Sequence, residues 1–202
     1  RAARLGTPDV DLLAKLGQRL VEEGLVADAR EPLLEAARLA ESAGERVKAS
    51  VVFTQLAELF PRDPVSREGL VRLADGSGKR HERSQARIAL AACHLRAGDV
   101  RAAFKVIGDA IDADRDGLSV LDSLGDLISA GAGLDPSNIP TAFPGTWPDG
   151  ARAWTVVRIS LLRALGAASD AKPALLALID ELGVHPRVRL AAGRLLLDMG
   201  AL

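Results

Sequence analysis

Residues 95–112, LRAGDVRAAFKVIGDAID, carry the pattern that decides the fold. Gly98-Asp99 marks a turn, and small or apolar residues follow it at helical spacing: Ala103, Ile107 and Ala110. Counted outward from a repeat that starts at Ser84, related patterns start near residues 118, 152 and 186, which keeps a 34-residue spacing. A fixed period of this length is typical of helical-repeat architectures. The regular spacing therefore predicts an all-α chain of stacked helix pairs.

The N-terminal segment from Val10 to Glu41 predicts another helix pair. Thr7-Pro8-Asp9 is a helix-start signal, Gly24 interrupts the apolar pattern, and Asp28 can cap the second helix. The apolar stripe of the first helix consists of Leu12, Leu13, Leu16, Leu20 and Val21. The buried face expected for the second consists of Leu33, Leu34, Ala36, Ala37, Leu39 and Ala40. Two antiparallel helices joined by a short turn form an αα-hairpin.

Both stretches resemble tetratricopeptide repeats, which are helix–turn–helix units with small or apolar residues at fixed offsets. In a repeat that starts at Val10, the family's packing offsets hold Leu13, Leu16-Gly17, Leu20, Gly24, Ala29, Leu33 and Ala36. Helix backbones are expected to approach closely at Gly17, Ala29 and Ala36. Glu41 departs from the pattern, because Pro is frequent there. The resemblance implies a right-handed αα-hairpin solenoid of about five helix pairs with one irregular repeat.

The second repeat, residues 44–79, is degenerate. One helix is expected over residues 47–60, Pro61 ends it, and Asp63-Pro64 starts the next. About six residues more than one period separate this repeat from the one at Ser84, so an insertion is expected at residues 76–83.

The largest irregularity is GAGLDPSNIPTAFPGTWPDG, residues 131–150. Its four prolines forbid a continuous helix, and Asp135-Pro136 can start only one short turn. We therefore expect repeats over residues 1–130, a Pro-rich irregular insert that replaces a helix over 131–150, and further repeat helices, truncated at the C-terminus, over 151–202.

Composition excludes several classes of protein. Twenty-six basic and 27 acidic residues give a net charge of −1, which provides no cationic field for nucleic acid. The single cysteine excludes an intramolecular disulfide and a Cys-rich metal site, and no apolar run approaches the ~20 residues that a membrane-spanning helix needs. Five of the basic residues are Lys, and abundant Ala accompanies them, which indicates a GC-rich, bacterial genome. Because the chain opens without Met and stops in mid-pattern, we interpret it as a piece of a larger protein, with a cytoplasmic location favoured.

Three chemical motifs are incomplete, so no enzyme activity, cofactor or metal is expected. Gly76-Ser77-Gly78-Lys79 lacks the first Gly and the final Ser or Thr of a phosphate-binding loop and follows a helix instead of a strand. Cys93 and His94 are successive helical residues whose side chains diverge by about 100°. Asp109 precedes residues 112–117, which match the first half of a calcium loop through Asp112, Asp114 and Asp116, but Ser123 replaces the Glu that would complete it.

Solenoids of this kind bind proteins or peptides in a groove lined by the first helix of each pair. The register places in that groove Lys15, Gln18, Glu22, Lys48, Gln55, Gln85, Ala92, Arg96, Asp122 and Asp126. This set has mixed charge and becomes acidic toward Asp122 and Asp126. Some family members clamp a partner's C-terminal carboxylate with Lys and Asn at matching groove sites, and this sequence lacks that clamp. The alternative is that these residues are solvated helix faces.

The insert supplies a second candidate set, Ile139, Phe143 and Trp147. Aromatic side chains are frequent interface anchors, but we favour the alternative that these three cap the hydrophobic edge left by the missing helix. The sequence thus predicts a scaffold or adaptor that binds a partner protein or peptide. The alternative is a regulatory or sensor arm of a larger multidomain enzyme or transcriptional regulator, and the near-neutral charge argues against an RNA-binding repeat.

Overall fold

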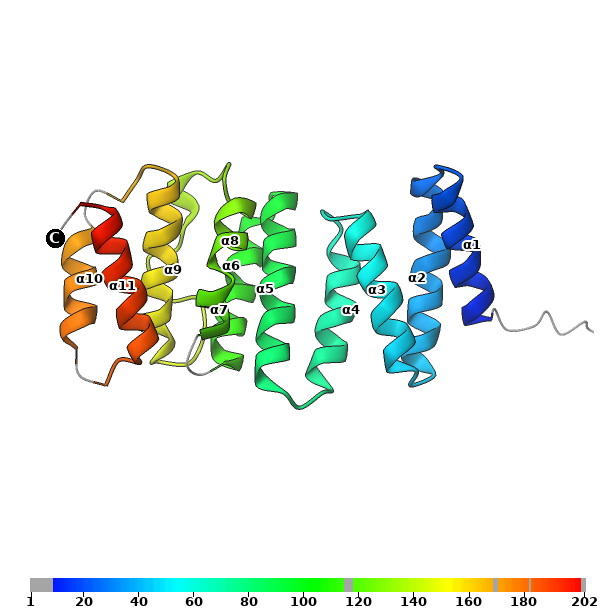
Figure 1. Cartoon of the computed structure of the whole chain (residues 1–202), viewed down its shortest axis with the longest axis horizontal. Helices are drawn as coiled ribbons and strands as arrows, with labels where there is room; N and C mark the ends of the chain where they lie inside the picture. The colour runs from blue at the N-terminus through cyan, green and yellow to red at the C-terminus, as the bar shows by residue number, and fades with distance from the viewer. Residues whose placement is uncertain (1–8, 115–117, 169–170, 182, 201–202) are drawn as a thin grey trace, which may run out of the picture. The chain divides into compact units, whose positions relative to one another are not determined.

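The computed structural model describes residues 9–114, 118–168, 171–181 and 183–200, and this part of the chain is all-helical. It divides into two compact units, unit 1 over residues 1–76 and unit 2 over residues 77–202 (Figure 1). Among the described helices, none joins the length to the apolar character that crossing a bilayer would demand.

Unit 1 consists of four helices, each packed against the next: α1 (Val10–Glu22), α2 (Val26–Ser42), α3 (Arg46–Leu59) and α4 (Pro64–Asp75). Asp9 and Asp63 cap α1 and α4 by accepting hydrogen bonds from backbone N–H groups two residues on. The helices predicted at Val10 and Pro64 are therefore confirmed. Asp28 does not cap α2, because that helix already begins at Val26 and places Asp28 inside its first turn.

Small residues allow the helices of unit 1 to approach closely. Ala29 and Ala36 are completely buried, and a Cβ added to Gly17 would lie 2.4 Å from Cγ of Leu33. All three positions therefore lie in the packed interior, and at Gly17 the neighbour is the Leu33 side chain. The apolar stripe of α1 is narrower than predicted, because Leu12 and Leu16 are 66% and 49% exposed.

Unit 2 contains the remaining helices. They are α5 (Arg80–Ala97), α6 (Val100–Ala113), α7 (Leu118–Asp122), α8 (Leu124–Ala130), the 3₁₀ turn η1 (Pro136–Asn138), α9 (Gly150–Ala164), α10 (Ala171–Asp180) and α11 (Pro186–Asp198). An insertion was expected over residues 76–83. Because α5 begins at Arg80, only residues 76–79 of that range lie outside a helix. The helix expected after residue 118 is interrupted at Ser123, where Asp, Ser and Gly neighbours have weak helix propensity.

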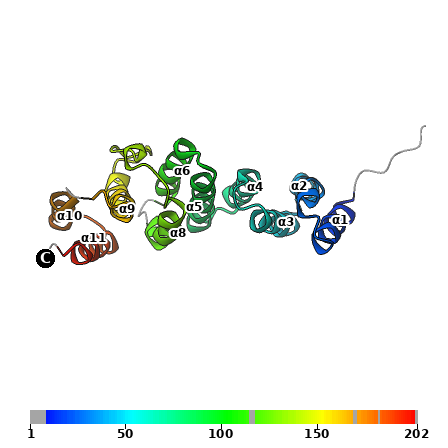
Figure 2. The same cartoon turned by 90° about the horizontal axis from the view of Figure 1, so that it is seen from above.

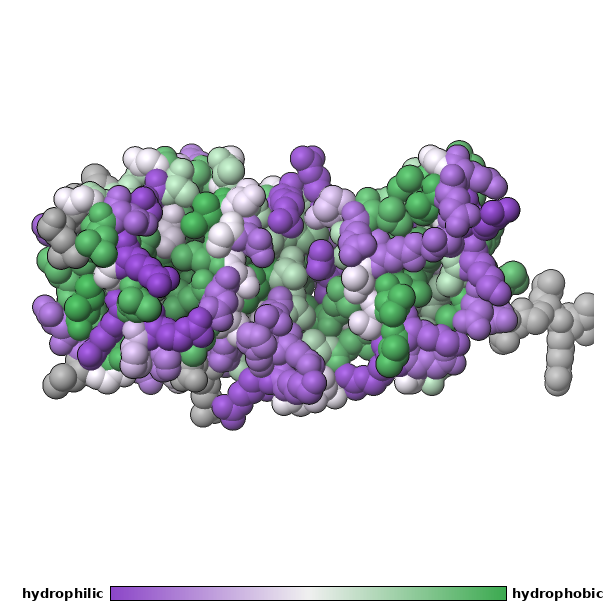
Figure 3. All heavy atoms as spheres, in the orientation of Figure 1, coloured by the Kyte–Doolittle hydropathy of each residue, from purple (hydrophilic) through white to green (hydrophobic). Residues whose placement is uncertain are grey.

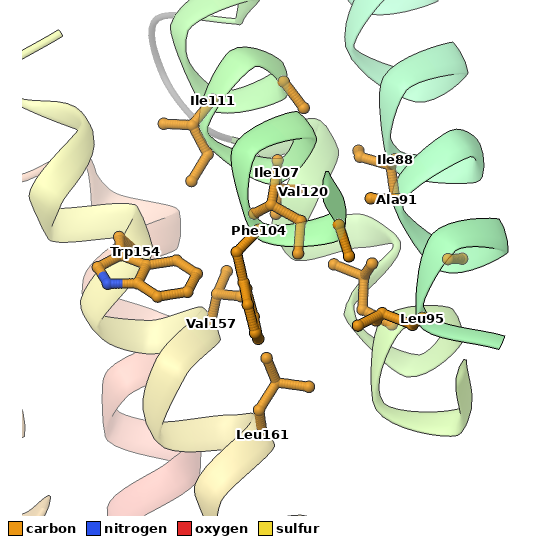
Figure 4. Close-up of a cluster of buried hydrophobic side chains, with 14 of the residues drawn as sticks. Ile88, Ala91, Leu95, Phe104, Ile107, Ile111, Val120, Trp154, Val157 and Leu161 are labelled. Carbon is orange, nitrogen blue, oxygen red and sulfur yellow. The ribbon is translucent and has the colours of Figure 1, made fainter. Parts of the chain in front are cut away.

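Helix α9 lies at the centre of unit 2. It contacts α6, α7 and α8 as well as α10 and α11. Trp154 of α9 meets Phe104 of α6 edge to face, with ring centroids 5.7 Å apart, and Val157 and Leu161 extend the same buried cluster (Figure 4). The sequence register assigned α9 to the first helix of a new pair, but its contacts with α6 give it a more central position.

The segment 131–150 packs tightly onto α6. A Cβ on Gly108 would lie 2.6 Å from the backbone N of Gly145, so the backbones of α6 and of this segment are in contact. Asp112 then accepts three hydrogen bonds: from the backbone N and Oγ1 of Thr146, both at 2.7 Å, and from the backbone N of Trp147 at 2.9 Å. Burial raises the pKa of the Asp112 carboxyl, but these hydrogen bonds favour the ionised form and bring the pKa below its ordinary 3.8.

We expect Gly108→Ala and Gly193→Ala to change stability in opposite directions. The first Cβ collides with backbone that cannot rotate away, and overpacking of this kind costs about 1–3 kcal/mol. Gly193 lies in α11 with nothing within 4 Å of an added Cβ, so Ala there stabilises the helix by about 0.5–1 kcal/mol. Urea unfolding followed by tryptophan fluorescence measures both, because Trp147 and Trp154 lie in unit 2. Equal effects of the two substitutions would contradict the close contact at Gly108.

We expect Asp112→Asn to loosen the segment 131–150. The amide loses the charge that three donors share, so the free energy of unfolding falls by about 1–2 kcal/mol and Trp147 emission shifts to the red. Since the Asp112 pKa is lowered in the fold, its stabilisation is present above about pH 4 and is lost as pH falls through the lowered pKa. The difference between wild type and variant should therefore shrink below pH 4. Asp109→Asn, an exposed change on the same helix, is the control.

Candidate protein-interaction surface

Helices α1 and α3 meet along a row of polar side chains in unit 1. Nζ of Lys48 lies 3.1 Å from Oδ1 of Asp11, and Nε2 of Gln55 donates to Oε1 of Gln18 at 3.2 Å. The structure therefore brings Gln18 and Gln55 of the predicted groove together. Lys15 and Glu22 lie within one turn of Gln18 on α1, and both are exposed.

Apolar side chains lie exposed beside this row. Val51 is three residues after Lys48 and four before Gln55, so it shares their side of α3, and it is 63% exposed. Val47, one turn earlier, is 80% exposed, and hydrophobic surface is visible over α3 in Figure 3. On α1, Leu12 and Leu16 flank Lys15. We define the α1–α3 face as Leu12, Lys15, Leu16, Gln18, Glu22, Val47, Lys48, Val51 and Gln55.

The sequence held a signal for these exposed valines that the groove prediction missed. The apolar residues of α3, which include Val47, Val51 and Val52, are distributed round the helix and do not form one stripe. A helix that is apolar on several sides needs more neighbours than a two-layer stack supplies. The exposure of Leu12 and Leu16 could not be predicted in this way, because their spacing is that of a buried stripe.

Helix α5 and the start of α8 carry the next predicted groove residues. Gln85 and Arg96 are exposed on α5, and Asp126 is exposed on α8. Ala92 is buried in the core of unit 2, so its assignment to the groove is wrong. Within the described residues, no hydrogen bond or ion pair joins Gln85, Arg96 or Asp126 to another predicted groove residue.

Asp122 lies at a cleft in unit 2 that the sequence did not predict. Two adjoining hollows of about 240 and 470 Å³ share Leu124, Leu195 and Asp198, and together they form what we call the α8–α11 cleft. Its walls are α7, α8 and α11, and α9 is its floor; α8 and α11 lie on the same side of α9 in Figure 2. Asp122 pairs with Arg187 at its edge. Arg187 of α11 therefore offsets the negative charge expected at Asp122.

The insert residues belong largely to the core of unit 2. Ile139 is 4% exposed and packs in the same buried cluster as Phe104 and Trp154, so it cannot anchor a partner in this fold. Phe143 and Trp147 are half-buried against the same cluster. Trp147 also borders a hollow of about 390 Å³ with Arg152 and His185. Only parts of the two aromatic rings therefore remain accessible.

The residues of the incomplete chemical motifs are buried or make contacts within the fold. Cys93 is buried, and Nδ1 of His94 lies 3.9 Å from Oδ2 of Asp99. Nζ of Lys79, from the phosphate-loop-like segment, lies 2.6 Å from Oε1 of Glu82.

The acidic run does not gather into a metal site within the described residues. Asp109 is exposed, and Asp112 holds the insert. Asp114 accepts hydrogen bonds from the backbone N and Oγ of Ser119, and Asp116 lies outside the described residues. No described group of three or more His, Cys, Asp or Glu side chains could hold a metal ion.

Comparison of the chain with family models, with curated proteins and with solved structures found no match.

Proposed function

We propose that this chain is a tetratricopeptide-like helical-repeat scaffold that binds a partner protein or peptide. Antiparallel neighbours such as α1 with α2 and α5 with α6 make the most extensive helix contacts. Close approach over Gly17, Ala29 and Ala36 supports the family's packing rule. The first helices of successive pairs begin at Val10, Arg46, Arg80 and Leu118, near the expected period.

The α1–α3 face carries the proposal for function. It combines exposed Val47 and Val51 with polar and charged neighbours of both signs. Exposed apolar residues that cluster within a polar rim mark interaction sites on soluble proteins. Burying such side chains against a partner contributes roughly 25 cal/mol per Å² of apolar surface. The polar row at Gln18 and Gln55 supplies donors and acceptors that orient the partner.

We expect a photo-crosslinking amino acid at Val51 to capture a partner from extracts of the source cells. The same group at Arg38, an exposed position on α2, should capture little, because α2 offers no comparable apolar side chains there. Val47→Asp combined with Val51→Asp should abolish the crosslink formed from Lys15, and Arg38→Glu should leave it intact. Mass spectrometry of the crosslinked bands gives the readout.

Circular dichroism controls for folding in each variant, and the exposure of both valines makes loss of structure unexpected. Equal capture from positions 38 and 51, or a Lys15 crosslink that survives the double aspartate variant, would contradict the α1–α3 face as the binding surface.

A further inference from the structure

We propose that the α8–α11 cleft is a second binding site, and that it accepts an amphipathic helix carrying a carboxylate beside its apolar stripe. The inference rests on the proposed function in that the ligand is again a protein segment. It adds a separate location in unit 2 and the chemistry of the segment.

The interior of the cleft is apolar, and small side chains form its floor. Leu124 and Ile128 form one wall, Leu195 forms the other, and Ser160 and Ala164 of α9 lie beneath. Leu190 and Leu197 stand on α11, with Leu190 lining the cleft, and they are 55% and 64% exposed. Figure 3 shows hydrophobic surface over α11 between hydrophilic side chains. A ridge of apolar side chains can therefore enter between the walls and cover Leu190.

The cleft favours a helix over an extended peptide. An extended segment needs partners for its backbone N–H and C=O groups, whereas a helix satisfies its own. The uncharged polar side chain in the lining is Ser160, and its hydroxyl already donates to the carbonyl of Val156 at 2.8 Å. The remaining polar groups are charged side chains at the rim.

Charge at the rim selects an acidic ligand. Arg187 pairs with Asp122, and Nη1 of Arg163 lies 3.0 Å from Oδ2 of Asp198. Arg194 is exposed on α11 between these pairs and, among the described residues, makes no ion pair. Three guanidinium groups against two carboxylates leave one positive charge, which a ligand carboxylate complements.

The same charge disfavours a second copy as the occupant. The exposed side of α11 presents Arg194 between Leu190 and Leu197. Two copies that met through this side would therefore bring like charges together in an apolar contact, which costs free energy.

The test is a selection of helix-forming peptides displayed on phage against the intact chain. Each peptide has leucines at i, i+4 and i+7, and the positions beside this stripe are randomised among Glu, Gln and Lys. We expect Glu to be enriched next to the stripe. The selected peptide, fluorescein-labelled, is then titrated by anisotropy against wild type and variants.

We expect Arg194→Glu to weaken binding by about tenfold or more, and Lys in place of the selected Glu on the peptide to restore it. Ala164→Phe should block binding, because it fills the hollow from an exposed position. Arg101→Glu and Ala151→Phe are matched controls at exposed positions outside the cleft lining. Should Ala164→Phe not fold, Leu190→Asp replaces it.

Selected peptides without acidic bias, or binding insensitive to Arg194→Glu and Ala164→Phe, would overturn the inference. So would a dimer in sedimentation equilibrium that Ala164→Phe dissociates, because the occupant would then be a second copy. Crosslinking from Val51 is unaffected by these variants in unit 2, so failure of this inference is distinguishable from failure of the proposed function.

Discussion

Close approach of helices over residues without side-chain bulk is the constraint on which both units depend. In unit 1, a Cβ on Gly69 would lie 2.5 Å from Cζ of Phe53, as one on Gly17 would collide with Leu33. In unit 2, Gly108 admits the backbone of Gly145 itself. Such contacts leave little internal space, because a neighbouring side chain or backbone segment fills the position that a Cβ would take. Binding chemistry is therefore confined to outer helix faces and to places where regular packing fails.

The sequence predicted local structure well and neighbours poorly. Helix starts at Val10 and Pro64 followed from capping residues, which act within one turn. The exposure of Leu12 and Leu16 could not follow in the same way, because periodicity identifies an apolar side without saying which helix covers it. The central position of α9 could not be predicted for the same reason, because its sequence pattern suits a buried helix in either layer.

The two candidate surfaces also differ in how far the sequence could predict them. Gln18 and Gln55 could be placed together because the predicted register assigns α1 and α3 to the first helices of successive repeats. The α8–α11 cleft combines Asp122 with Arg187, which lie 65 residues apart, and joins them over a helix whose position was not predictable. Burial of Ile139 was foreseen only as one of two alternatives, because a Pro-rich segment has no periodicity from which a buried side can be read.

Residues 131–150, which depart from the predicted repeat, pack against α6 and against the start of α9, the helix that forms the floor of the cleft. Asp112 and Gly108 hold residues 143–147 against α6 as non-helical chain, which occupies less width than a helix with its side chains. Helix α9 can then contact α6 through Trp154 and Phe104 and still lie beneath α8 and α11. Helices α7 and α8 also contact α9, and together with α11 they form the walls of the cleft. The cleft and the insert thus share α9 as a neighbour, although none of the residues that anchor the insert lines the cleft.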